Sequence, residues 1–161
     1  MITGEFHGAK LLLTCGDRML TYLRDDDAGI PFPAHWDLPG GGREGHETPI
    51  ACALRELDEE FALRLPPDAL TGHDFASFQD PSMRSWLFTG TITDDQIAAI
   101  RFGDEGQEWR MMPLADYLSH PRRIPHFCDW ILGSRLINFQ SQKMTVAARA
   151  TADRKTFGHL S

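Results

Sequence analysis

The chain has 161 residues, of which 42% are hydrophobic and 24% are charged, and its formal net charge is −7 at pH 7. A chain of this length fits one domain with a sizeable core, and this composition excludes collagen, a coiled-coil rod and wholesale disorder. The negative balance argues against broad binding to nucleic acid, which needs a basic face, but not against a phosphate substrate held through a divalent metal ion.

The first half of the chain is expected to form strands ahead of one strong helix. The strand-like segments are Phe6–Thr14, Met19–Arg24 and Trp36–Leu38. The last of them runs into a glycine turn at Pro39–Gly42. Thr48 is a preferred N-cap and Pro49 is favoured at the first helical position, so the sequence predicts a helix from there to about Leu63.

The second half alternates strands with helices. The strand-like segments are His73–Phe78, Ser85–Ile92 and Glu108–Met112. The expected helices are 93–100, Leu114–Leu118 and Pro125–Phe139. This mixed order predicts an α+β fold in which helices cover a mixed sheet. We expect one domain over residues 1–139 and a loosely attached polar tail over residues 140–161.

The cysteines and the lengths of the apolar runs indicate the cellular compartment of the protein. The three cysteines are scattered, which indicates reduced thiols in a cytosol and not a disulfide framework. The longest aliphatic run, Leu11–Leu13, is far shorter than the ~20 apolar residues that span a bilayer. We therefore expect a cytoplasmic protein that has no membrane partner.

The predicted helix carries an acidic face. Its members, which fall opposite the apolar face at ~100° per residue, are Glu56, Glu59 and Glu60. Carboxylates packed on one face repel one another unless solvent screens them or a divalent cation binds them. A solvated surface would suffice for a bare acidic helix. The preceding Gly40–Gly42 segment, which lets backbone approach closely, and Glu47 at the helix entrance favour Mg²⁺, which takes carboxylates, waters and substrate phosphates as ligands.

This segment resembles the Nudix box, G-x5-E-x7-R-E-U-x-E-E-x-G-U, in which U is a bulky aliphatic residue. The positions that match in register are Gly41, Glu47, Arg55, Glu56, Leu57, Glu59, Glu60 and Leu63. The second glycine of the box is Ala62 here, which we expect to lengthen the helix slightly or to shift its exit without loss of activity. Two flanking segments, 36–42 and 103–109, are similar to MutT-like members, and the second resembles their K-E-G-Q…E-W loop.

The resemblance implies a Nudix fold, an α/β/α sandwich around a mixed β-sheet, and metal-dependent hydrolysis of a nucleoside diphosphate linked to another group. It implies Mg²⁺ as the cofactor, with Mn²⁺ as an alternative. The implied metal ligands are the Gly41 carbonyl and the carboxylates of Glu56, Glu59, Glu60 and Glu105. The metal ion would neutralise phosphate charge, lower the pKa of a bound water and fix its line of attack.

Catalytic roles are expected for Glu56, Glu105 and Arg55. Either glutamate is a candidate general base, and the sequence does not choose between them. Glu105 matches the loop glutamate of MutT-like members, although the alternative of an exposed loop acid stays open. Arg55 is expected to orient the glutamates without touching substrate. Glu47 is expected either to contact the metal ligands without binding the metal ion itself or to bind an additional metal ion.

Two residues near the second strand are candidates for substrate binding. Arg24 at the end of that strand could reach a phosphate or could be a surface arginine. Trp36, like Phe78 and Trp86, could stack on a base, although aromatic residues on strands are more often part of the core.

Arg123 is a third candidate, for contact with phosphate, ribose or base, with a solvent-facing side chain as the alternative. It lies in the stretch Pro121–His126, where MutT-like members carry an asparagine that reads an oxidised guanine. No asparagine stands in this stretch, which puts specificity for 8-oxo-dGTP in doubt.

The loop similarity favours a nucleoside triphosphate that is cleaved to monophosphate and pyrophosphate. ADP-ribose, a nucleotide sugar and a dinucleoside polyphosphate stay open, whereas a capped or triphosphorylated RNA end is disfavoured by the acidic balance. A hypothesis from another class is a Nudix-fold sensor that binds a nucleotide without cleaving it, which is disfavoured because the box glutamates are present. Many members of the family dimerise, so a homodimer is the alternative to a monomer.

Overall fold

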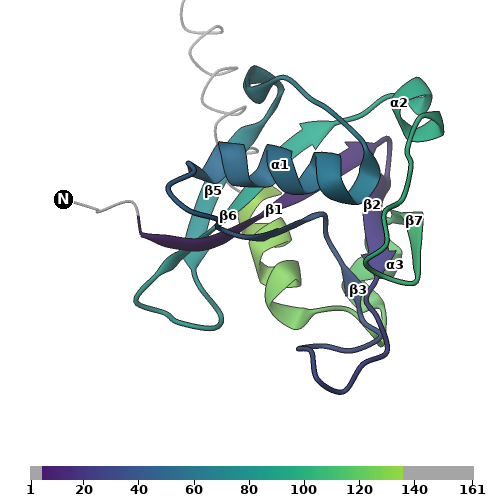
Figure 1. Cartoon of the computed structure of the whole chain (residues 1–161). Helices are drawn as coiled ribbons and strands as arrows, with labels where there is room; N and C mark the ends of the chain where they lie inside the picture. Colours follow the sequence, from purple (N-terminus) through teal and green to yellow (C-terminus); the bar gives the residue numbers. More distant parts are fainter. Residues whose placement is uncertain (1–4, 136–161) are drawn as a thin grey trace, which may run out of the picture.

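The computed structural model describes residues 5–135, which form one mixed sheet of seven strands with helices on both faces (Figure 1). The strands are β1 (Phe6–Cys15), β2 (Arg18–Leu23), β3 (Trp36–Asp37), β4 (Gly40–Gly42), β5 (Thr71–Ala76), β6 (Arg84–Thr91) and β7 (Glu108–Pro113). The helices are α1 (Pro49–Phe61), the 3-10 helix η1 (Pro67–Ala69), α2 (Asp94–Ala98), α3 (Leu114–Ser119) and a helix that includes residues 125–135.

The sheet is built around β1. The strand order is β3-β2-β1-β6-β5, with β4 also paired to β1 and β7 also paired to β2. β1 and β6 run parallel, and the other strand pairs in the described part of the chain are antiparallel. The sheet is therefore mixed, as expected.

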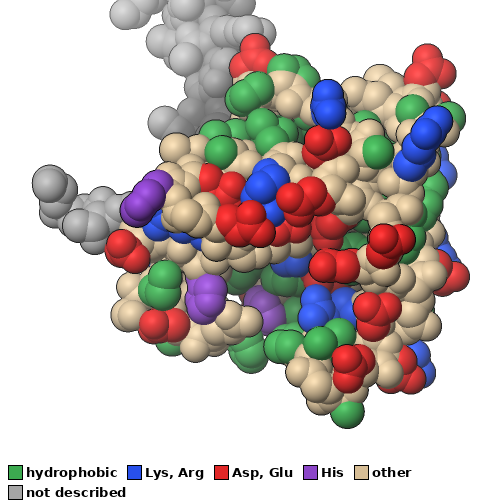
Figure 2. All heavy atoms as spheres, in the orientation of Figure 1, with side chains coloured by type: hydrophobic (Ala, Val, Ile, Leu, Met, Phe, Trp, Pro, Cys, Tyr) green, Lys and Arg blue, Asp and Glu red, His purple; other side chains and the backbone are tan. Residues whose placement is uncertain are grey.

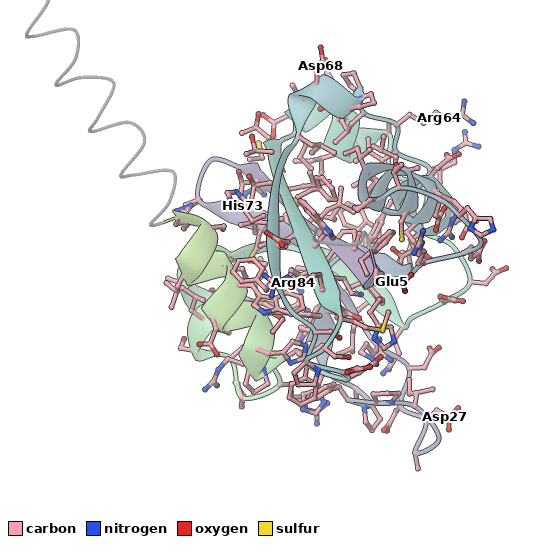
Figure 3. The ribbon with its side chains drawn as sticks, turned by 90° about the vertical axis from the view of Figure 1, so that its left-hand side faces the viewer. Glu5, Asp27, Arg64, Asp68, His73 and Arg84 are labelled. Carbon is pink, nitrogen blue, oxygen red and sulfur yellow. The ribbon has the colours of Figure 1, made fainter. Side chains whose placement is uncertain are left out.

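The two faces of the sheet carry two separate cores. Alternation along β1 places Leu11 and Leu13 in the cluster under α1 and Leu12 in the cluster on the opposite face. The first cluster includes Leu57 and Phe61 of α1, whereas the second is covered by α3 and the 125–135 helix. Figure 3 shows α1 and the 125–135 helix on opposite sides of the sheet. The expected α+β class and α/β/α sandwich are confirmed.

Three boundaries differ from the sequence-based expectation. The glycine turn is a short strand, β4, which pairs with β1 at Ala9 and Gly41. β5 ends at Ala76, so Phe78 lies in the loop before β6 and not in a strand. The expected lengthening of α1 is wrong: the helix ends at Phe61, because Ala62 adopts the left-handed conformation with φ 51° and the chain turns away.

The expected end of the last helix at Phe139 and the expected tail over residues 140–161 lie outside the described residues. The division into residues 1–139 and a tail therefore stays a prediction. Within residues 5–135 no helix has the length and apolar character needed to cross a membrane.

Candidate functional site

Helix α1 places the acidic residues beside strand β4. The Thr48 hydroxyl accepts a hydrogen bond from the Ala51 N–H at 3.3 Å, which caps the helix, and Pro49 occupies its first turn. Leu57 is fully buried against the sheet and fixes the rotation of the helix about its axis. The residues on the other side of α1 consequently face the outer surface, where acidic side chains gather around a basic one (Figure 2).

Arg55 is the centre of this group. Its Nη2 donates to the Glu47 carboxylate at 2.8 Å and to the Gly42 carbonyl at 3.0 Å, and its Nη1 donates to Glu56 at 3.0 Å and to Glu59 at 3.2 Å. The hydrogen bonds from Arg55 lower the pKa of Glu47 to about 2. The structure therefore brings together Arg55, Glu47, Glu56 and Glu59 and holds Glu47 ionised.

Strand β4 lies directly against α1 at Gly41. A Cβ atom at Gly41 would stand 2.6 Å from Oε1 of Glu56, closer than side chains approach one another. The Gly41 carbonyl accepts a weak hydrogen bond from the Cys52 thiol at 3.5 Å. The missing side chain thus creates a cradle in which the Glu56 carboxylate lies against the Gly41 backbone.

Glu60 departs from the predicted exposed face. Its side chain is only 7% exposed, and its Oε1 accepts a hydrogen bond from the Gly40 N–H at 2.7 Å. At ~100° per residue Glu60 lies about 60° from Leu57, so it flanks the buried stripe and is covered by β4. Burial raises the pKa of Glu60 to about 8.

The expected metal ligands are close in the chain but are not arranged around one point. Among residues 5–135, no three histidine, cysteine, aspartate or glutamate side chains are placed to hold a metal ion together. Arg55 binds Glu56 and Glu59, and Glu60 turns toward Gly40. The oxygen donors and the cradle at Gly41 still fit a hard cation such as Mg²⁺, provided that the carboxylates turn away from Arg55.

Glu105 lies on the segment between α2 and β7. The backbone of this segment packs on the end of α1, because the Gly103 N–H donates to the Glu60 carbonyl at 2.9 Å. The Glu105 side chain is exposed, and within the described region it has no hydrogen bond or ion pair. The structure therefore places Glu105 near the group but not in it.

A cavity of about 530 Å³ opens on the other side of β4. Figure 2 shows this face hollowed beside the acidic group. The aromatic residues that line the cavity are His7, Phe32, Phe78, Trp86, His126, Phe127 and Trp130. Gly41 and Gly42 line it as well, so β4 separates the cavity from the carboxylates of α1 by the thickness of one strand.

A stacked pair forms part of the cavity wall. The rings of Phe78 and His126 are 4.3 Å apart and nearly parallel, at 2°. Phe78 is 61% exposed, whereas His126 is half-buried, and burial lowers the pKa of His126. The sequence indicates Phe78 as a candidate for base stacking but not His126, because the contribution of His126 depends on the packing of the 125–135 helix. The ring of Trp86, another candidate, packs against the core under α1.

The cavity wall also contains a buried carboxylate, Asp37, which is 1% exposed. Its Oδ1 accepts from Lys10 Nζ at 3.0 Å and from the Leu38 N–H at 2.7 Å. Its Oδ2 accepts from the Tyr22 hydroxyl at 3.0 Å and from Arg24 Nη1 at 2.8 Å. Arg24 is thus in the cavity wall, whereas the sequence analysis missed Lys10 and Asp37. A lysine inside the apolar run of the first strand was the available signal.

Two of the expected substrate contacts do not reach the cavity. Trp36 is 4% exposed and belongs to the core opposite α1, with the Arg110 guanidinium 4.7 Å from its ring, so the expectation that it stacks on a base is not supported. The Arg123 guanidinium donates to the His120 carbonyl at 2.8 Å and does not line the cavity.

The sequence model of the NUDIX domain family matches residues 8–130. Diphosphoinositol polyphosphate phosphohydrolase 3-alpha of Homo sapiens is 36% identical over 63 residues, which span 39% of the chain and 38% of that relative. RNA pyrophosphohydrolase of Acidiphilium cryptum (strain JF-5) is 32% identical over 127 residues, which span 67% of the chain and 74% of that protein. The crystal structure of the MutT protein from Methanosarcina mazei Go1 covers 86% of the chain and 99% of its own at a TM-score of 0.66 and 18% identity, a likeness of fold.

Proposed function

The chain belongs to the NUDIX domain family, and from this membership we propose that it is a metal-dependent pyrophosphohydrolase whose substrate is a nucleoside diphosphate linked to another group. The favoured substrate is a nucleoside triphosphate, cleaved to monophosphate and pyrophosphate. One observation carries the proposal: an aromatic cavity and a group of carboxylates meet at Gly41, so a base in the cavity would place its phosphates beside the carboxylates.

The metal ligands in this proposal are the Gly41 carbonyl and the carboxylates of Glu56, Glu59 and Glu60, with Glu105 joining from its loop. When bound, Mg²⁺ or Mn²⁺ would neutralise phosphate charge and lower the pKa of a bound water. Arg55 would orient the carboxylates, since it already binds Glu56 and Glu59. Glu47 would in turn orient Arg55 through its paired hydrogen bonds.

We favour Glu56 over Glu105 as the general base. A base works best when its pKa lies near the working pH, and burial raises the pKa of Glu56. Glu56 also lies against Gly41, where the cavity meets the acidic group. Glu105 is exposed and would first need its loop to move.

The cavity suits a nucleobase better than an inositol polyphosphate. A planar base stacks on aromatic rings such as those of the Phe78–His126 pair in the cavity wall. A ring that carries many phosphates needs several cations, whereas the lysines and arginines that line the cavity are Lys10 and Arg24, both bound to Asp37. An inositol polyphosphate is therefore disfavoured as a substrate of this chain.

A triphosphorylated RNA end is the second candidate substrate. The observation in its favour is the match to the RNA pyrophosphohydrolase of Acidiphilium cryptum, which spans 74% of that protein. The net charge of −7 disfavours it, because a longer RNA would need a basic path along the surface.

The test is a panel of nucleoside triphosphates, ADP-ribose, nucleotide sugars, dinucleoside polyphosphates and a triphosphorylated RNA oligonucleotide, with each product identified by mass. We expect Mg²⁺-dependent release of a nucleoside monophosphate, which EDTA abolishes. Glu59→Gln should lower turnover by several orders of magnitude, whereas Asp68→Asn, which neutralises an exposed carboxylate on η1, should not (Figure 3). A panel with no product but with tight nucleotide binding would identify a sensor.

A further inference from the structure

A buried ion group lies in the cavity wall, next to β4. Its members are Lys10, Asp37 and Arg24. We propose that this group is a prebuilt receptor for the phosphate that is attached to the nucleoside, with Lys10 and Arg24 as phosphate-binding residues and Asp37 as a positioning residue. The proposal rests on the proposed function, because it assumes a nucleotide in the cavity.

Asp37 has no capacity left for another ligand. An ionised carboxylate offers about four acceptor positions. Those of Asp37 are taken by Lys10 and the Leu38 N–H on one oxygen and by Tyr22 and Arg24 on the other. Asp37 is also almost completely buried. These contacts exclude a role as base or metal ligand and leave the role of holding two cations side by side.

The group contains two cations for one carboxylate, so one positive charge has no partner within it. The side chain of Lys10 is 17% exposed and that of Arg24 is 22% exposed, and both residues line the cavity. A partly buried cation is attracted more strongly to an anion than one in open water, because the surroundings are less polarisable. The cavity therefore favours a ligand that carries negative charge beside these two side chains.

Arg24 has donors to spare for such a ligand. A guanidinium has five N–H donors. Arg24 uses Nε for the Pro31 carbonyl at 2.9 Å and Nη1 for Asp37 at 2.8 Å. Its remaining N–H groups have no hydrogen bond to the described residues. They suit two phosphate oxygens, which a guanidinium binds in the paired geometry it prefers.

Lys10 connects the cavity with the acidic group. Its Nζ donates to the Gly40 carbonyl at 3.1 Å and to the Leu38 carbonyl at 3.3 Å, both longer than its 3.0 Å contact with Asp37. A phosphate oxygen is charged and is a stronger acceptor than a carbonyl, so it can replace one of them. Gly40 precedes Gly41, which contacts Glu56, and Lys10 also lies 5.7 Å from the Phe127 ring centre. A nucleoside phosphate has the same order of parts: aromatic base, first phosphate, then the bridge that is cleaved.

The first experiment measures binding without metal, so that it does not depend on turnover. AMP, GMP, CMP and UMP are titrated in EDTA against the wild-type protein by calorimetry, each beside its nucleoside. We expect at least one monophosphate to bind at least about tenfold more tightly than its nucleoside. Lys10→Met and Arg24→Met should each reduce this difference in affinity, called the affinity gap, to less than about threefold. Arg64→Met removes an exposed arginine outside the cavity lining and should leave the affinity gap unchanged (Figure 3).

The result that overturns the proposal is a wild-type protein that binds no monophosphate more tightly than its nucleoside, or a folded Lys10→Met or Arg24→Met variant that keeps the full gap. Failure of the proposed function looks different: the substrate panel with Mg²⁺ then gives no product, while the gap in EDTA persists. Because Asp37 keeps at least one cation and Tyr22 in each variant, we expect both proteins to fold.

A second measurement needs no variant at Lys10 or Arg24. The chain has three lysines, Lys10, Lys143 and Lys155, so ¹⁵N-lysine labelling gives at most three ammonium signals. Lys143→Arg and Lys155→Arg identify the Lys10 signal by elimination. We expect the chemical shift of that signal to change when the monophosphate that binds in the first experiment is added, and to stay the same when its nucleoside is added. A Lys10 signal that responds equally to both would contradict the assignment.

Discussion

Ala62 carries backbone strain at the end of α1. Its φ of 51° lies in the left-handed region, which costs an alanine about 1 kcal/mol more than a glycine. The conformation persists because the Ala62 N–H bonds to the Asp58 carbonyl and because Leu63, 5% exposed, is drawn into the core directly after the turn. The tertiary contacts of Leu63 therefore fix an exit that the sequence alone disfavours.

We expect Ala62→Gly to raise the free energy of unfolding by about 1 kcal/mol, because glycine adopts this conformation without strain. Urea denaturation measures the change. The control is Ala51→Gly, an exposed position inside the first turns of the same helix, where the substitution should lower stability by about 1 kcal/mol. If both substitutions lowered the free energy of unfolding by a similar amount, Ala62 would not be strained.

Glu60 makes the stability of the metal-free protein depend on pH. Burial raises its pKa from the ordinary 4.5 to about 8, so between these values the unfolded chain releases the proton while the folded chain keeps it. The folded state then binds more protons, and stability falls as the pH rises, by at most about 1.4 kcal/mol per pH unit from this residue. Below pH 4.5 both states are protonated and this contribution is constant.

We expect Glu60→Gln to flatten the fall in unfolding free energy between pH 5 and pH 8, a window set by the raised pKa of Glu60. The measurement is denaturation in EDTA at each pH unit. Asp68→Asn serves as control, because it removes an exposed carboxylate on η1. If Glu60→Gln shows the same slope as the wild type, the proton is not held by Glu60.

At the scale of elements, the contact between α1 and β4 creates the candidate site. Helix α1 is buried on two sides: Leu57 faces the sheet, and Cys52 and Glu60 face β4. The close approach at Gly41 depends on the absence of a side chain there. The sequence predicts a turn at these glycines, because hydrophobic periodicity carries no information on three small residues. Only their pairing with β1 shows that they form a strand.

We expect Gly41→Ala to lower turnover by about 100-fold, because a Cβ atom 2.6 Å from Oε1 would push the Glu56 carboxylate aside. The contact is with the end of a side chain, so the free energy of unfolding should change by only about 1 kcal/mol. Gly42→Ala is the matched control, since its nearest neighbour would be the His7 carbonyl oxygen at 3.9 Å. Equal turnover in the two variants would refute the role of the cradle.

At the scale of the whole molecule, the buried residues of both described cores lie before residue 132. The cluster under α1 contains buried residues from Phe6 to Ile92, and the opposite cluster contains buried residues from Leu12 to Ile131. The cavity lies between the sheet and the 125–135 helix, with the ion group in its wall. Fold and cavity therefore depend on residues that precede the expected tail.

We expect a chain that ends at residue 139 to keep its thermal midpoint within about 3 °C and its kcat/KM within about threefold of the full chain. Thermal unfolding by circular dichroism and turnover of the preferred substrate measure the two quantities. The prediction fails if the shortened chain aggregates or if its midpoint falls by about 10 °C, because residues 140–161 would then belong to the domain.

The sequence by itself determined the family, the fold class and the acidic helix, because these depend on local order: a spaced motif, the alternation of apolar residues and a capped helix. It placed Arg55, Glu47, Glu56 and Glu59 in one group for the same reason. Only the tertiary structure showed that Glu60 is buried, that Trp36 belongs to the core and that Lys10 and Arg24 both bind the Asp37 carboxylate. Those features arise where β1, β2, β3 and β4 meet, and the spacing of residues along the chain does not encode such contacts.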